Sequence, residues 1–182
     1  MDPVRPEEAA AVGWIGFGLV LAACTAWGWE RAAELARRPG ELRVLRSALQ
    51  ALESEIGFGV TPLPQACQRI AGLYPEPAAT LFRAAAVALG PPRSRTAAAA
   101  WEEAVEAMAR HSALTGEDRD ILRALAPYLG ATDREDQIRH LRLAMHRLEA
   151  AEAAARDLDQ RWGRLYRYGG ALAGALIGLL LL

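Results

Sequence analysis

The sequence predicts an all-α fold: an antiparallel bundle of short helices between two terminal transmembrane helices, of which the last helix is long and continuous into the membrane. Two observations carry this prediction. Both ends of the chain are apolar, because residues 9–29 and 171–182 contain no charged side chain. Between them, apolar residues recur at helical spacing, and no segment of useful length shows the alternating pattern of a strand.

Composition sets few limits on function. The 182 residues include 21 basic and 22 acidic ones, for a net charge of −1, so nothing points to nucleic acid as a partner. Two cysteines, Cys24 and Cys67, stand in very different surroundings and predict neither a disulfide framework nor a metal site.

The segment 9–29 follows a short polar external tail, residues 1–8, and is predicted to be a transmembrane helix. A helix of this length measures about 30 Å, which is enough to cross a bilayer. Tryptophans lie near its two ends, where amphipathic rings favour the membrane interface: Trp14, Trp27 and Trp29.

The distribution of arginines around this segment predicts the topology. One arginine precedes it, and five follow it closely: Arg31, Arg37, Arg38, Arg43 and Arg46. Positive charge favours the cytoplasmic side of a membrane helix. Residues 30–165 are therefore expected to form a cytoplasmic helical bundle, with both termini of the chain outside.

A second interpretation of the first segment is a lipid-anchored extracytoplasmic helical binding module. Leu21-Ala22-Ala23-Cys24 is similar to a lipoprotein cleavage site, in which Cys24 would accept the lipid. The preceding residues, however, include three acids against one arginine, whereas a signal peptide begins with positive charge. Cleavage before Cys24 is therefore the alternative to a retained helix.

Gly and Pro divide the middle of the chain into short helices. The first helix is expected to end at Pro39-Gly40. The helix after it shows a spacing typical of a seam that docks on another helix, at Leu42, Leu45, Leu49, Leu52 and Ile56. Thr61 should cap the following helix, with Pro62 in its first position. After this second helix, four further helices are expected before the last one, at residues 62–73, 78–89, 96–114 and 118–129, with Gly116 in a loop.

The last helix is expected to run from Thr132 to the C-terminus, because no proline occurs in this part of the sequence. Thr132 with Glu135 three residues later predicts a capping box. Acid-before-base pairs at a spacing of four, such as Glu152 with Arg156, indicate a solvated face on this helix.

Residues 166–182 are the second predicted transmembrane helix, and its short length suggests that a partner helix lies beside it. An interfacial collar marks its start: Arg161, Arg164, Tyr166, Arg167 and Tyr168. Small residues at a spacing of four predict close helix packing in the membrane, at Gly170, Gly174 and Gly178 and, in the first segment, at Gly18, Ala22 and Ala26. The two segments could pair with each other, with another protein, or with a second copy in a homo-oligomer.

No catalytic, cofactor-binding or metal site is predicted. The histidines His111, His140 and His146 lack the spacing that ligand pairs on a helix need, and the sequence contains no phosphate loop, HExxH or CxxC motif. We therefore expect a protein that is not an enzyme. An enzyme whose site leaves no local motif is the third interpretation.

Five blocks of the sequence, with the apolar ends, are specific in combination. They are Leu49-Gln50-Ala51-Leu52-Glu53-Ser54-Glu55-Ile56, Thr61-Pro62-Leu63-Pro64, Leu129-Gly130, Asp133-Arg134-Glu135-Asp136-Gln137-Ile138 and Leu165-Tyr166-Arg167-Tyr168. Together they resemble the stage III sporulation protein AB family of endospore-forming bacteria over nearly the whole chain. Gln65 and Cys67 depart from the family's pattern, and the acidic N-terminal tail is extra.

The resemblance implies a structural platform or adaptor of the sporulation channel between mother cell and forespore, on the mother-cell side of the outer forespore membrane. It implies a helical domain similar to the platform domains of type II secretion machines. The implied partners are membrane lipid, other sporulation channel proteins and a secretion-type ATPase, stage III sporulation protein AA. We expect the ATPase contact on loops 58–64 and 130–137, at Phe58, Thr61, Pro62, Asp133, Glu135 and Gln137.

Overall fold

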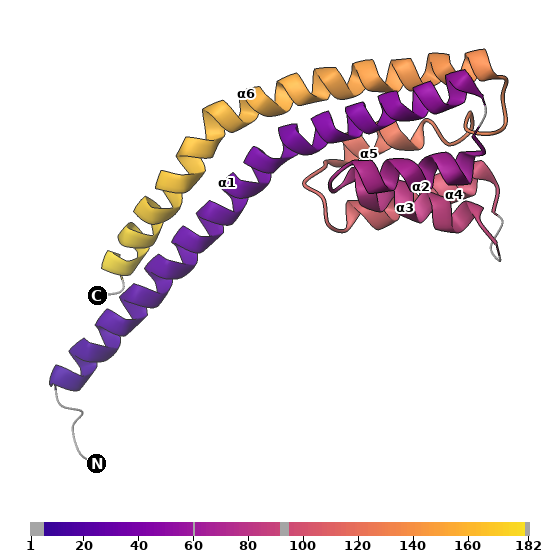
Figure 1. The fold of residues 1–182 in the computed structure, drawn as a ribbon. Helices are drawn as coiled ribbons and strands as arrows, with labels where there is room; N and C mark the ends of the chain where they lie inside the picture. The colour runs from indigo at the N-terminus through magenta and orange to yellow at the C-terminus, as the bar shows by residue number, and fades with distance from the viewer. Residues whose placement is uncertain (1–5, 60, 92–94, 181–182) are drawn as a thin grey trace. The chain divides into compact units, whose positions relative to one another are not determined.

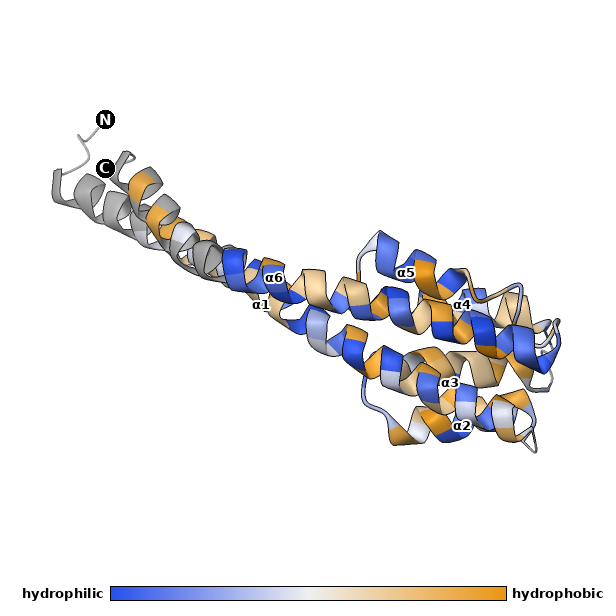
Figure 2. Ribbon diagram, turned by 90° about the horizontal axis from the view of Figure 1, so that it is seen from above, coloured by the Kyte–Doolittle hydropathy of each residue, from blue (hydrophilic) through white to orange (hydrophobic). Residues whose placement is uncertain are grey.

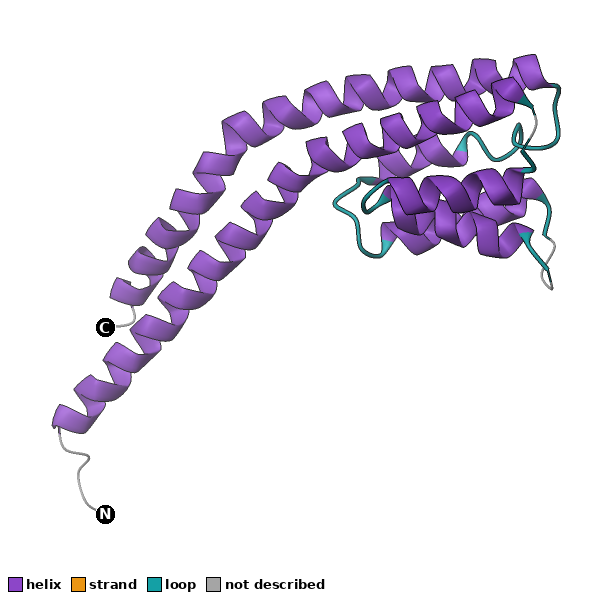
Figure 3. Cartoon of the chain, in the orientation of Figure 1, coloured by secondary structure: helices purple, strands orange, loops and turns teal. Residues whose placement is uncertain are grey.

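The computed structural model describes the backbone of residues 6–59, 61–91 and 95–180, and within these ranges all side chains except those of residues 6–17, 163–168, 170–171, 173–175 and 177–180. The described chain is helical and contains no strand (Figure 3). Its six helices are α1 (Pro6–Phe58), α2 (Leu63–Leu73), α3 (Ala78–Leu89), α4 (Ala97–Ala109), α5 (Gly116–Arg123) and α6 (Arg134–Leu180). The predicted all-α class and the long last helix are confirmed for these residues.

The chain divides into two compact units. The central unit comprises Arg37–Ala155, and the terminal unit comprises Met1–Ala36 with Arg156–Leu182. The helices α1 and α6 contribute to both units (Figure 1). No helix among the described residues has a stretch that is both long and apolar enough to cross a bilayer, so the two predicted transmembrane helices, 9–29 and 166–182, are not supported by the structure.

Helix α1 does not end at Pro39-Gly40 as predicted, but continues through both residues. A proline inside a helix costs about 3 kcal/mol, because it removes one backbone hydrogen bond and clashes with the preceding turn. Contacts on either side of the proline offset this cost. The guanidinium of Arg38 donates to the Asp118 carboxylate at 2.8 and 2.9 Å, and the Glu41 carboxylate accepts from the backbone N–H of Ala113 at 2.7 Å.

Within the central unit, α1 and α6 lie side by side as an antiparallel pair (Figures 1 and 2). Arg43 binds Glu152 at 2.9 Å and Arg142 binds Glu53 at 2.7 Å. The contact thus moves ten residues forward on α1, from position 43 to 53, as it moves ten residues back on α6, from position 152 to 142. The predicted leucine seam of α1 is confirmed, because four of its members have no exposed surface: Leu42, Leu45, Leu49 and Leu52.

Helices α2 to α5 complete the core of the central unit. α3 packs against both α2 and α4, and α5 packs against α4. Phe82 of α3 and Trp101 of α4 meet edge to face with ring centroids 5.7 Å apart. The indole N–H of Trp101 donates to the carbonyl oxygen of Leu122 at 2.7 Å, which satisfies a buried donor and ties α4 to α5.

Two of the middle helices differ from their predicted bounds at the start or end. α3 has the predicted bounds, and Thr96 caps α4 by accepting from the N–H of Ala99 at 3.3 Å, but α4 ends at Ala109 rather than at residue 114. α5 begins at Gly116, which was expected in a loop, because Thr115 and Asp118 form a capping box around its first turn, and it ends at Arg123 rather than at residue 129.

The predicted caps of α2 and α6 are each displaced by one residue. The N-cap of α2 is Pro62, which makes no side-chain hydrogen bond, so Thr61 is not the cap. At α6, the Asp133 carboxylate accepts from the N–H of Asp136 at 2.8 Å. The Thr132 hydroxyl donates instead to the carbonyl oxygen of Tyr128 at 3.0 Å, so the predicted capping box at Thr132 is wrong.

Candidate docking surface

The two loops predicted to contact the ATPase meet at one end of the central unit. The loop after α1 and the loop before α6 together line a cavity of about 210 Å³, to which Thr61, Gly130 and Gln137 contribute. We call this end of the bundle the docking surface and define it as residues 57–63 and 130–137, of which residue 60 is not described. The predicted loops are thus adjacent in space although about 70 residues separate them in sequence.

Arg134 connects the two loops. Its Nη1 donates to the carbonyl oxygen of Gly57 at 3.2 Å. Its guanidinium also fills the space that a Cβ at Gly59 would need, so any side chain there would overlap it. Gly59 has a φ of 66°, in the left-handed region, and its N–H donates to the carbonyl oxygen of Glu55 at 3.1 Å, which ends α1. The positive φ therefore favours glycine at this position, and a side chain there would also displace the Arg134 guanidinium.

Phe58 is the most conspicuous side chain of the docking surface, because 83% of it is exposed. The Gln137 amide donates to the carbonyl oxygen of Thr132 at 2.8 Å and so braces the loop before α6. Thr61 is half-buried. Among the predicted contact residues, the structure exposes Phe58, Pro62, Asp133 and Glu135.

Four of the five arginines predicted to set the topology form ion pairs in the central unit. Arg37 binds Glu41 at 2.9 Å. Arg38 binds Asp118, whose side chain is 1% exposed. Burial alone would raise the pKa of Asp118, but hydrogen bonds from Arg38 and the Thr115 backbone outweigh it and hold that pKa below its ordinary value. These arginines therefore have a structural role that the sequence analysis did not find.

Arg43 and Arg46 bind the α6 carboxylate of Glu152 at 2.9 and 3.7 Å. Glu152 was predicted on a solvated face, but it is 3% exposed. The prediction is wrong because the pattern of acids and bases along α6 does not reveal that α1 covers this face. A buried carboxylate requires such charged partners to remain ionised.

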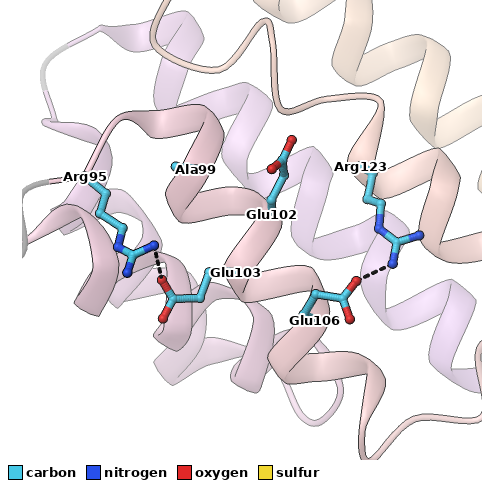
Figure 4. Close-up of a pocket in the computed structure, with 6 residues that line it drawn as sticks. All are labelled: Arg95, Ala99, Glu102, Glu103, Glu106 and Arg123. Atoms are coloured by element: carbon cyan, nitrogen blue, oxygen red, sulfur yellow. Dashed lines mark hydrogen bonds and ion pairs between the residues drawn. The ribbon is translucent and has the colours of Figure 1, made fainter.

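A cavity of about 390 Å³ beside α4 is lined mainly by charged side chains, but their arrangement does not favour catalysis. In Figure 4, Arg95 binds Glu103 at 3.3 Å, Arg123 binds Glu106, and the carboxylate of Glu102 is directed away from both pairs. The hydrogen bond from Arg123 lowers the pKa of Glu106, which is opposite to the shift that a general acid needs. No histidine is among the described residues that line this cavity.

Metal ligands and reactive thiols also lack a suitable arrangement in the described part of the chain. No group of three or more His, Cys, Asp or Glu side chains there could hold a metal ion. The ring of His140 stacks on Tyr128. Burial raises the pKa of Cys67 to about 12, so its thiol is a packed apolar group.

The residues predicted at the membrane lie in the terminal unit. Trp27 and Trp29 are 56% and 64% exposed, and Arg161 is exposed. Gly18, Ala22 and Ala26 are exposed too. The remaining predicted positions lie outside the residues whose side chains are described: Trp14, Arg164, Tyr166, Arg167, Tyr168, Gly170, Gly174 and Gly178.

Comparison with known proteins identifies the family. The family model for stage III sporulation protein AB matches residues 13–182. The stage III sporulation protein AB of Bacillus subtilis (strain 168) is 36% identical over 168 residues, which is 92% of this chain and 98% of that protein. A solved structure of a stage III sporulation protein AB superposes with a TM-score of 0.64 at 38% identity, covering 68% of this chain and 96% of that one. The chain therefore belongs to the stage III sporulation protein AB family.

Proposed function

We propose that this chain is a non-enzymatic platform or adaptor of the sporulation channel complex between mother cell and forespore, and that it docks a secretion-type ATPase, stage III sporulation protein AA. Family membership supports a role in sporulation. One observation carries the docking role: two loops far apart in sequence meet at one end of the central unit and present Phe58 almost fully exposed.

The local geometry suits Phe58 to binding. An exposed aromatic ring on a fixed backbone loses little freedom when a partner covers it, and buried aromatic rings often dominate the energy of an interface. The hydrogen bond from Arg134 to Gly57 and the left-handed Gly59 fix the backbone on both sides of the ring. The exposed carboxylate of Glu135 adds an acidic rim, which favours a basic surface on the partner.

Substitution of Phe58 tests the docking role. Phe58→Ala should weaken binding of the full chain to the purified ATPase by at least about tenfold, because truncation of a central aromatic costs about 2 kcal/mol or more. Leu73→Ala is the matched control, since Leu73 is 70% exposed on α2 and lies outside the docking surface. Equal affinity of Phe58→Ala and the parent would exclude this docking site.

We propose in addition that both ends of the chain are held in the outer forespore membrane, with residues 30–165 in the mother-cell cytoplasm. The support is the uncharged sequence at residues 9–29 and 168–182 and the exposed rings of Trp27 and Trp29. A reporter that works only outside the cytoplasm, fused after Leu182, should be active. Activity of a cytoplasmic reporter at the same position would contradict this topology.

The lipid-anchored alternative makes a different prediction for the mature chain. Retention of the first segment gives a mature N-terminus that still contains residues 1–23, whereas lipoprotein processing gives one that begins at Cys24. Mass spectrometry of the N-terminal peptide from sporulating cells separates the two. We expect the retained segment.

A further inference from the structure

The apolar residues that α1 and α6 bury in the central unit recur every seven positions. On α1 the buried leucines form two pairs at this spacing, Leu42 with Leu49 and Leu45 with Leu52. On α6 three buried residues share it, namely Leu141, Leu148 and Ala155. Seven residues are close to two full turns, so a slip of one helix by this length turns the same faces towards each other again. The apolar pattern of these two helices alone therefore does not select one register.

The charges beside the apolar residues also recur every seven positions, but their sign alternates. On α1, Arg46 is followed by Glu53. On α6, the residues at this spacing are Glu135, Arg142, Glu149 and Arg156. In the structure Arg46 binds Glu149 at 2.9 Å and Arg142 binds Glu53 at 2.7 Å. Because α1 and α6 are antiparallel, a step of seven residues forward on α1 matches seven back on α6, and both pairs define the same register (Figures 1 and 2).

A slip of seven residues in one direction would reverse these pairings. Arg46 would come opposite Arg142, and Glu53 would come opposite Glu135. Two attractions would be replaced by two repulsions, since like charges brought together across a contact raise its energy.

A slip in the other direction has a similar result. The same two residues of α1 would come opposite Arg156 and Glu149, which again are like charges. Arg43 would lose Glu152 and gain a different acid, Asp159, so this slip replaces one ion pair but still loses two. The alternation of charge thus disfavours both registers that the apolar pattern allows.

These ion pairs contribute more to the choice of register than to stability. Between 18% and 65% of each of the four side chains is exposed, and such pairs add little to the free energy of unfolding. Selectivity depends instead on the difference in energy between the registers. Fixing the register is also the best-attested role of polar groups in a contact between helices.

The register of α1 against α6 determines whether the docking surface forms. α1 ends at Phe58 and α6 begins at Arg134, so one docking loop follows the first helix and the other precedes the second. A slip of seven residues would move these two helix ends apart by about 10 Å, at 1.5 Å per residue. The 3.2 Å hydrogen bond from Arg134 to the carbonyl oxygen of Gly57 could not form at that separation.

We propose that Arg46, Glu53, Arg142 and Glu149 are positioning residues that fix the register of α1 against α6 and so bring the two docking loops together. The consequence for ATPase binding rests on the proposed function. The register itself is measured without the ATPase, so the two can fail separately.

Reversal of the charges on α1 tests this proposal. Arg46→Glu with Glu53→Arg places like charges together at the observed register and opposite charges together after a slip of seven residues in either direction. Spin labels at the exposed positions Gln50 and Ala150 report the register of the full chain in detergent by double electron–electron resonance. Cys24→Ser removes one thiol from the background, and the buried thiol of Cys67 stays unlabelled.

The double variant should give a distance distribution displaced from that of the parent, because a slip moves the labels by about 10 Å along the helix axes. Its affinity for the purified ATPase should fall at least about tenfold, since the docking loops no longer meet. Addition of Arg142→Glu and Glu149→Arg restores opposite charges at the observed register, and both measurements should return to the parent values. General destabilisation by four substitutions would not be reversed in this way.

Arg31→Glu with Glu34→Arg is the matched control, because it reverses an exposed ion pair that lies within α1. It should change neither the distances nor the affinity. Unchanged distances in the double variant of Arg46 and Glu53 overturn the proposal, and so does a fourfold variant that does not restore them. If the distances shift and return as expected while the ATPase affinity stays constant, the register is confirmed and the docking surface of the proposed function is overturned.

Thermal unfolding verifies that each variant is folded. If the double variant is not folded, Glu53→Arg alone and its rescue by Arg142→Glu repeat the test, with the same expected and refuting results. This pair is the better second choice because Arg46 also lies 3.7 Å from the buried carboxylate of Glu152.

Discussion

Replacing Arg38 with Met removes the guanidinium that neutralises Asp118 and keeps an unbranched apolar side chain in its place. Asp118 is 1% exposed and accepts hydrogen bonds from Arg38 at 2.8 and 2.9 Å and from the N–H of Thr115 at 2.9 Å. Breaking a buried ion pair by removing one partner costs about 3–5 kcal/mol. The Arg38 side chain is 13% exposed, and the Thr115 hydrogen bond survives the substitution. We therefore expect a loss of about 2–4 kcal/mol in the free energy of unfolding.

The assay is urea denaturation of the full chain in detergent, followed by far-UV circular dichroism, with amide hydrogen exchange of α5 as a local readout. Arg31→Met is the matched control on the same helix, because Arg31 and Glu34 pair at 2.9 Å with more than half of each side chain exposed. This control should change stability by at most about 0.5 kcal/mol.

The pH dependence gives a second check. The pKa of Asp118 in the folded chain lies below its ordinary value, which is about 3.9 in the unfolded chain. Ionised Asp118 therefore contributes its full stabilisation at any pH above the unfolded pKa. This contribution is lost as the pH falls through the folded pKa. The difference between the parent and Arg38→Met should therefore be constant from about pH 5 to 7 and shrink below about pH 4. A loss no larger than that of Arg31→Met, or one that is the same at pH 3 and pH 7, refutes the reasoning.

Three further predictions concern the core and the docking surface. Trp101→Phe removes the hydrogen bond from the indole N–H to the carbonyl oxygen of Leu122, which still accepts from the N–H of Leu125 at 3.1 Å, so it should cost about 1 kcal/mol in urea denaturation; an unchanged midpoint would contradict the role of this bond. Gly59→Ala places a Cβ at positive φ against the Arg134 guanidinium, so it should lower the melting temperature and weaken ATPase binding together. Cys67 should resist alkylation at pH 8 in the folded chain and react in urea, because burial raises its pKa to about 12; mass spectrometry of the labelled peptides measures both rates.

Local sequence patterns predicted the helices correctly where no other signal in the same segment conflicted with them. The apolar spacing of Leu42, Leu45, Leu49 and Leu52 located the buried seam of α1, and the breaks at both ends of α3 gave its bounds. At α5 two local signals conflict. Thr115 with Asp118 three residues later is a capping-box pattern, whereas Gly116 favours a loop, and the structure shows the capping box.

Tertiary contacts decided the positions where local rules failed. Pro39 is a strong stop signal, yet α1 continues through it because Arg38 and Glu41 both bind the region around α5. Arg38 and Asp118 are 80 residues apart, and Arg43 and Glu152 are 109 apart. Spacing along a single sequence gives no information on pairs at such distances.

The contact of these two loops with the ATPase stays a prediction, which was made because the loops were expected to face away from the membrane. The structure shows that the two loops are adjacent and that Phe58 is exposed. The clamp that Arg134 forms on Gly57 was not predicted, because the hydrogen bond joins residues 77 positions apart. The positive φ of Gly59 favours glycine there, and its contact with the Arg134 guanidinium could not be predicted from the sequence.

The long separation between the arginines of α1 and their carboxylates has a consequence during synthesis. Arg38 leaves the ribosome 80 residues before Asp118, and Arg43 leaves it 109 residues before Glu152. At about 5–20 residues per second, these side chains stay without those partners for several seconds or more. During that interval they lack the carboxylates that they bind in the folded chain, and these ion pairs form only after the bundle closes. The same residues are thus cations without those partners in the nascent chain and members of ion pairs in the finished protein.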